Sequence, residues 1–191
     1  MRLTRLFLVF GLCVVAPGCG SKDSNPLGAL ASCGFPACYL DLLGPCLPSG
    51  ACVEQVTATC GASACPTPTT TMPTAEAINV CYGNGVKMIM AIDMSNPQVE
   101  TSTSTVKKGS AVCFTTAGTM DLNASAMSGT TIVKNAAGTV VATMDLDMST
   151  KTETITCAGA SPVVVSLDCV KSYGGTSNDT GNSCTKGICN P

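Results

Sequence analysis

Cysteine is the residue type that most constrains how this chain folds, because 14 of its 191 residues are Cys. Cys13 lies inside an apolar run near the N-terminus, and Cys19 closely follows that run. The other twelve are Cys33, Cys38, Cys46, Cys52, Cys60, Cys65, Cys81, Cys113, Cys157, Cys169, Cys184 and Cys189. Aromatic residues make up only 4% of the chain, and small domains with such thin cores are commonly stabilised by cross-links. The even set predicts up to six disulfides in an oxidising compartment.

The side chains that are missing exclude several kinds of chemistry. The chain contains no His, so the commonest general base and a frequent metal ligand are absent. None of the cysteines forms a C-x-x-C pair, the spacing that zinc sites and redox dithiols favour. The sequence therefore predicts a protein that is not an enzyme and that holds no metal or cofactor.

The N-terminus has the pattern of an export signal. Residues 1–5 carry two Arg, and residues 6–16 are an apolar run too short to remain as a membrane-spanning helix. The run ends in Ala16-Pro17-Gly18-Cys19, which resembles the lipobox of bacterial lipoproteins. This resemblance implies that residues 1–18 are removed, that Cys19 is lipidated, and that residues 19–32 begin with a polar tether.

The same resemblance implies a location and a set of partners. Gly20 after the lipidated Cys indicates the outer membrane in that family, whereas Ala16, where Leu or Val is usual, leaves open an ordinary secreted protein. Without residues 1–18 the chain keeps 8 Lys, 12 acidic residues and no Arg. Because Arg is the side chain best suited to bind phosphate groups, a chain without Arg predicts no nucleic-acid partner. The lipid on Cys19 predicts contact with a membrane.

The cysteines of residues 33–65 have a palindromic spacing, with intervals of four, seven, five, seven and four residues. Pro36 opens a predicted helix through residues 38–43, Gly44 and Pro45 end it, and a second helix is predicted from about residue 50 to residue 60. Positions equidistant from the turn of such a helical hairpin face each other. The palindrome therefore predicts the nested disulfides Cys46–Cys52, Cys38–Cys60 and Cys33–Cys65, although other connectivities stay open.

A Pro/Thr-rich linker over residues 66–77 separates this hairpin from a β domain over residues 78–171. Within the domain, apolar residues alternate with polar ones, and turn signals lie at Asn84-Gly85 and near residues 109, 118, 138 and 159. This spacing predicts eight or nine antiparallel strands. Residues 172–191 read as a flexible tail, in which Cys184 and Cys189 are close enough to pair.

The predicted fold class is therefore mainly β, with a disulfide-stapled short helical hairpin followed by an antiparallel β meander or small sandwich. We expect Cys81, Cys113, Cys157 and Cys169 to link different strands of the β domain. Residues 86–95 and 140–149 resemble each other, which we interpret as two amphipathic strands built from few residue types rather than as a duplication.

Three groups of residues have the spacing of a site, and each has a simpler interpretation. Ser104 and Lys107 match the S-x-x-K motif, but on a Thr-rich strand this is a chance match. Asp145 and Asp147 fit a solvated strand face better than a calcium site, because no Asp-rich loop accompanies them. The Met residues of segments 88–94 and 144–148 fit a core that is short of aromatic residues better than a copper site.

These features predict a lipid-anchored, extracytoplasmic structural or interaction protein without catalytic activity. Its partner would be a protein or a glycan, contacted through the β domain. The alternative is a ligand-binding module for a carbohydrate, a cell-wall component or an ion, which would need a cleft with convergent polar groups.

Overall fold

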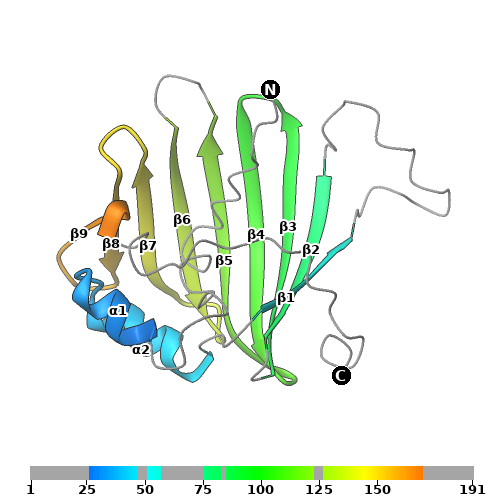
Figure 1. The fold of residues 1–191 in the computed structure, drawn as a ribbon, viewed down its shortest axis with the longest axis horizontal. Helices are drawn as coiled ribbons and strands as arrows, with labels where there is room; N and C mark the ends of the chain where they lie inside the picture. The colour runs from blue at the N-terminus through cyan, green and yellow to red at the C-terminus, as the bar shows by residue number, and fades with distance from the viewer. Residues whose placement is uncertain (1–25, 47–50, 57–74, 83–84, 123–126, 170–191) are drawn as a thin grey trace, which may run out of the picture.

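The computed structural model describes residues 26–46, 51–56, 75–82, 85–122 and 127–169. Over these residues the protein is mainly β, with nine strands in one antiparallel sheet whose spatial order is the chain order, β1 to β9. The predicted meander is therefore correct, and the strands do not split into a two-sheet sandwich (Figure 1).

The strands are β1 (Ala51–Val56), β2 (Ala75–Tyr82), β3 (Val86–Asn96), β4 (Val99–Lys108), β5 (Ala111–Asp121), β6 (Ser128–Asn135), β7 (Val140–Asp147), β8 (Thr152–Cys157) and β9 (Val163–Ser166). The helical elements come first in the chain and are α1 (Pro26–Ser32), α2 (Ala37–Leu43) and the short 3-10 helix η2 (Gly44–Cys46). From β2 to β9 the connections between consecutive strands are too short for a crossover helix, so these strands pair antiparallel in chain order.

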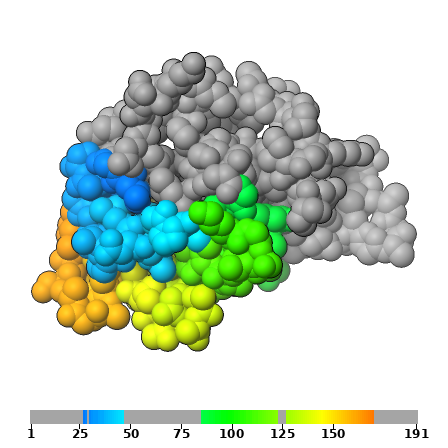
Figure 2. Space-filling view, turned by 90° about the horizontal axis from the view of Figure 1, so that it is seen from below, coloured from blue at the N-terminus to red at the C-terminus, as the bar shows by residue number. Residues whose placement is uncertain are grey.

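Side chains alternate between two faces of the sheet, as the two-residue period requires. On β3, for example, Val86, Met88, Met90 and Ile92 are buried on what we call the inner face, and Ile89 and Ala91 are exposed on the outer face. Apolar residues of α1 and α2, including Leu30, Tyr39 and Leu43, share one buried cluster with the inner face. Figures 1 and 2 show this helical segment beside the end of the sheet that contains β8 and β9.

The turns follow the predicted glycine positions with one exception. Gly109, Gly138 and Gly159 have positive φ and lie in the β4–β5, β6–β7 and β8–β9 connections. Ala117-Gly118 is not a turn, because β5 continues through it to Asp121. Gly118 instead lies on the inner face, where an added Cβ would come within 2.9 Å of the Thr131 hydroxyl. The absence of a side chain at Gly118 leaves space for the hydroxyls of Thr131 and Ser102 on the two neighbouring strands.

The predicted helical segment needs two corrections. The helix predicted over residues 38–43 exists as α2, but residues 51–56 form β1 rather than a second helix. The second helix of the segment is α1, which lies in the predicted tether and precedes α2. Val53 and Val56 fit a strand as well as a helix over so short a run, and pairing with β2 decides the outcome.

Candidate functional site: the covered inner face

Three disulfides attach the helical segment to distant parts of the chain. They join Cys33 to Cys169, Cys38 to Cys157, and Cys46 to Cys113. Their sequence separations are 136, 119 and 67 residues, so each closes a long loop. Disulfides persist in oxidising compartments, and this framework therefore indicates an extracytoplasmic environment.

The predicted nested pairs Cys33–Cys65, Cys38–Cys60 and Cys46–Cys52 are wrong, because the first cysteine of each has a different partner. The symmetry argument required a second helix antiparallel to α2, and β1 takes its place. The expectation that Cys113, Cys157 and Cys169 link strands among themselves is also wrong. All three bond to the helical segment, because α1 and α2 pack on the inner face.

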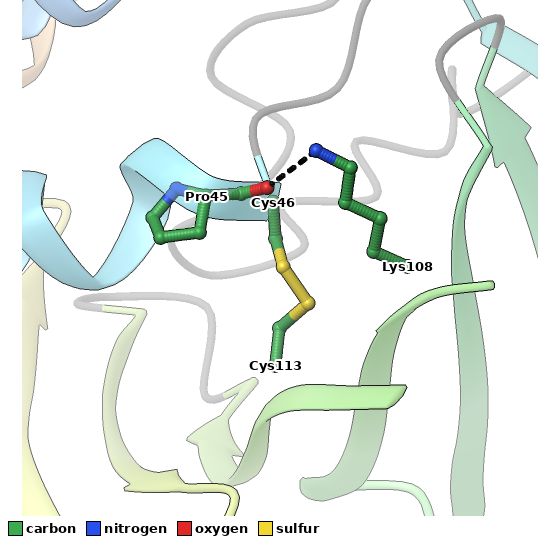
Figure 3. Close-up of a disulfide and its surroundings, with 4 residues drawn as sticks. All are labelled: Pro45, Cys46, Lys108 and Cys113. Carbon is green, nitrogen blue, oxygen red and sulfur yellow. Dashed lines mark hydrogen bonds between the residues drawn. A yellow bond between two sulfur atoms is a disulfide. The ribbon is translucent and has the colours of Figure 1, made fainter. Parts of the chain in front are cut away.

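The Cys46–Cys113 disulfide is reinforced by a polar contact from the neighbouring strand. Lys108, the last residue of β4, donates a hydrogen bond of 3.1 Å from Nζ to the backbone oxygen of Pro45 (Figure 3). The bond and the disulfide hold two consecutive residues, Pro45 and Cys46, against the β4–β5 hairpin. The C-terminal part of η2 is thereby held in place.

The inner face is a Met-rich apolar surface. Met88, Met90 and Met144 are each at most 3% exposed and belong to the main core cluster, with Met94 partly buried against it. Met120 is buried in a second small cluster with Leu146 and Leu167, and Met148 packs against it. The interpretation of the Met residues as core is confirmed, since unbranched thioether side chains fill irregular space where aromatic residues are few.

A patch of small hydroxyl side chains interrupts this apolar surface at the centre of the sheet. Ser104 on β4 and Thr116 on β5 share a hydrogen bond of 2.6 Å between their hydroxyls. Thr131 on β6 is 2% exposed, and its Oγ1 has no hydrogen-bond partner among the described residues. Gly118 lies between Thr131 and Ser102 and leaves room above the strand. The patch offers neutral hydroxyls in an apolar surrounding.

Replacement of Thr131 by Val tests whether this hydroxyl is satisfied. A buried hydroxyl without a partner is destabilising, so we expect Thr131→Val to raise the free energy of unfolding by about 1 kcal/mol. Denaturant unfolding at neutral pH measures the change. Thr119→Val, on the exposed side of β5, is the matched control and should change stability by less than about 0.5 kcal/mol. Destabilisation by Thr131→Val would mean that the hydroxyl has a partner.

Among the charged residues whose burial the structure describes, Glu153 is the most buried. It is 3% exposed on the inner face, where it lies opposite Leu146 on one side and Val165 on the other. This burial raises the pKa of its carboxyl from 4.5 to about 7. The pKa of Tyr39 on α2 is also raised, first by burial and then by the negative charge of Glu153. A carboxyl that titrates near neutrality therefore lies beneath the helical segment.

The predicted aspartates lie on the outer face and in turns. Asp145 accepts a hydrogen bond of 2.7 Å from the hydroxyl of Thr130 on the adjacent strand. Asp147 accepts hydrogen bonds from Ser149 and Thr150 in the β7–β8 turn, and those from Ser149 lower its pKa most. Both carboxylates thus have local partners, as the interpretation of a solvated face requires.

The two similar segments adopt the same local structure. Met90 of β3 and Met144 of β7 are both buried on the inner face. In each segment an Asp carboxylate oxygen accepts a bond of 2.8 Å from the backbone N–H two residues later, at Asp93 and at Asp147. Asp93 lies at a register shift within β3, which continues to Asn96, whereas Asp147 ends β7 and begins the turn to β8. Similar sequence here corresponds to a similar amphipathic strand and the same local hydrogen bond.

The S-x-x-K residues do not form a site. Ser104 is buried on the inner face of β4, whereas Lys107 lies on the opposite face three residues later, beyond a register shift between Val106 and Lys107. Within the described ranges, no three Cys, Asp or Glu side chains gather in a way that suits a metal ion. No helix in the part of the chain that the structure describes has the length and hydropathy needed to cross a membrane.

Several candidate cysteines fall outside the described residues. These are the predicted lipidation residue Cys19 and the disulfide candidates Cys60, Cys65, Cys184 and Cys189. Cys52 and Cys81 lie on the described strands β1 and β2. The described disulfides account for six of the twelve candidates.

Sequence reasoning missed Glu153 and Thr131, although a signal for each is visible. Glu153 alternates with Ile155 and Cys157 along β8, so a strict two-residue period places it on the apolar face. Thr131 alternates in the same way with Val133 on β6. In both strands the alternation that identifies the strand also places one polar residue on the apolar face.

Comparison with known proteins finds no family model, no curated protein and no solved structure that matches this chain.

Proposed function

We propose that this protein is a lipid-anchored, extracytoplasmic structural or interaction protein without catalytic activity, attached to the outer membrane through Cys19. The lipobox-like Ala16-Pro17-Gly18-Cys19 supports the anchor, and the disulfide framework supports the compartment. The partner is a protein or a glycan. It contacts the outer face of the sheet.

The observation that carries this proposal is the difference between the two faces. Helices cover part of the inner face, whereas the outer face carries a row of polar side chains in register across β4 to β8. The row consists of the threonines Thr101, Thr119, Thr130 and Thr154 and the carboxylate of Asp145. Exposed apolar side chains accompany this row: Ile89, Ile132 and Val164 are 38%, 38% and 65% exposed. A rigid surface with both characters suits recognition of a protein or a glycan.

The separation of potential catalytic groups supports a non-catalytic role. Ser104, which has Lys107 at motif spacing, hydrogen-bonds Thr116 on the inner face, whereas Lys107 lies on the other face. Acyl transfer requires the nucleophile and its base within hydrogen-bond reach of each other.

Substitution of Cys19 tests the anchor. We expect Cys19→Ala to move the full-length protein, expressed with its own N-terminus in a bacterial host, from the membrane fraction to the soluble extracytoplasmic fraction. Cys13→Ala, a cysteine substitution within the apolar run, is the control and should leave the protein on the membrane. Intact mass of the detergent-extracted wild type should show residues 1–18 removed and lipid present. A wild-type protein that is released without lipid would support the secreted alternative instead.

A ligand-binding module is the second candidate, and the hydroxyl patch on the inner face favours it. The hydroxyls of Thr131 and Ser102 lie beside Gly118, and the hydrogen-bonded pair of Ser104 and Thr116 lies two residues further along β4 and β5. The Thr131 hydroxyl is buried without a described partner. A carbohydrate or cell-wall fragment that hydrogen-bonds Thr131 would raise the melting temperature of the wild type more than that of Thr131→Val. Equal shifts in the two proteins would remove this candidate.

A further inference from the structure

The register of the first two strands places two cysteines opposite each other. β1 pairs antiparallel with β2 over six residues, and within this ladder Cys52 is the partner of Cys81. The neighbouring pairs Ala51 with Tyr82 and Val53 with Val80 continue the same register, so the match does not depend on one pair.

Directly opposite residues of an antiparallel pair have the separation that a disulfide needs. Their Cα atoms lie about 4.5 Å apart at a non-hydrogen-bonded position and about 5.5 Å apart at a hydrogen-bonded one. Disulfides span Cα distances of about 4.4–6.8 Å. Either kind of position therefore admits a cross-strand bond, and opposite residues lie on the same face of the sheet.

Among the described cysteines, Cys52 and Cys81 are the two that do not take part in the three disulfides above. Cys33, Cys38 and Cys46 are bonded to Cys169, Cys157 and Cys113, which removes the predicted partner of Cys52. Cys81 is opposite Lys87 on β3, and Lys87 is opposite Lys107 on β4. Both lysines occupy outer-face positions in the alternation of their strands. Cys52 and Cys81 thus occupy outer-face positions, on the side of the sheet away from the helical segment.

We propose that Cys52 and Cys81 form a fourth disulfide, across β1 and β2. In the reaction the two thiols lose two protons and two electrons, and a sulfur–sulfur bond forms. The electrons reduce the disulfide of an extracytoplasmic thiol oxidant to two thiols, by exchange through a mixed disulfide. The bond fixes an edge strand, because β1 pairs only with β2 among the described strands. Edge strands are prone to unwanted pairing, and a covalent link to the neighbouring strand holds β1 in register.

Peptide mapping of the oxidised full-length protein tests this pairing. Free thiols are alkylated in acid, and a protease that cleaves after Asp and Glu then separates residues 42–54, 55–76, 77–93 and 101–121. With Cys46 bonded to Cys113, the proposal predicts one species in which residues 42–54 are joined to both 77–93 and 101–121. Alkylated Cys81 in the wild type would overturn it. Residues 55–76 joined to either 42–54 or 77–93 would overturn it as well.

Single substitutions give a second readout. In Cys52→Ser we expect Cys81 to change from almost unalkylated to almost completely alkylated, with the three described disulfides retained. Cys60→Ser is the matched control and should leave Cys81 joined to residues 42–54. Alkylation of Cys81 in Cys60→Ser but not in Cys52→Ser would assign it a different partner. Mapping of the wild type requires no variant, so a variant that folds poorly does not prevent the test.

Discussion

Replacement of both Cys38 and Cys157 by Ser should lower the free energy of unfolding by about 4 kcal/mol. The disulfide between them closes a loop with a sequence separation of 119 residues and thereby restricts the unfolded chain. Since small domains are commonly stable by only about 5–15 kcal/mol, the loss should be a large part of the total. Denaturant unfolding of the oxidised proteins at neutral pH measures it, with each transition extrapolated to zero denaturant by its own slope.

Two further measurements make this result specific to the disulfide. Ala37→Ser with Ala158→Ser places serine at the exposed positions beside the two cysteines and should change stability by less than about 0.5 kcal/mol. Thiol mapping of Cys38→Ser should find a free thiol at Cys157. A free thiol at Cys60 instead would restore the nested pairing and contradict the tertiary arrangement.

Glu153→Gln should abolish most of the loss of stability that the wild type shows as pH rises from 4.5 to 7. Burial raises the pKa of Glu153 from 4.5 to about 7, so between these values the folded state holds a proton that the unfolded state releases. The contribution of the protonated carboxyl is therefore fully present below about pH 4.5 and is lost as pH rises through 7. The shift corresponds to about 3 kcal/mol.

The expected result is a difference in pH dependence between the two proteins. At pH 8 we expect Glu153→Gln to be more stable than the wild type by about 3 kcal/mol, and at pH 4 the two should be nearly equal. Asp41→Asn, which changes an exposed acid on α2, should keep the wild-type pH dependence. A wild-type profile in Glu153→Gln would show that the carboxyl does not lie buried beneath the helical segment.

Much of the sheet was predictable from local pattern. The alternation of apolar and polar residues located β3 to β9, and glycines after short polar runs located three of the connections. Ala117-Gly118 misled the prediction because a glycine that ends a strand and a glycine that makes room beneath a neighbour look alike in sequence. The prediction of a helix over residues 51–56 was wrong because six residues are too few to distinguish the helical period of apolar residues from the two-residue period of a strand.

The candidate site was less predictable, because its features depend on distant segments. The buried hydroxyl of Thr131 has no partner among the described residues, and Gly118 on the adjacent strand offers it no side chain. Glu153 acquires its raised pKa from burial on the inner face, beneath α2. Neither the desolvation of a carboxyl nor the missing partner of a hydroxyl is a property of the residues beside it in the chain.

The sequence by itself determined the mainly β class, the antiparallel succession of strands and the abundance of disulfides, because strand periodicity, turn chemistry and cysteine number are local or compositional properties. It left open a meander or a small sandwich, and the pairing of the described strands in one sheet decides for the meander. Only the tertiary structure decided which cysteines meet. Cys33, Cys38 and Cys46 are followed closely in sequence by Cys52, Cys60 and Cys65. Their partners are instead the distant cysteines Cys169, Cys157 and Cys113. The physical reason is that disulfide pairing follows Cα separation in space, which is set by α1 and α2 packing on the inner face of the sheet.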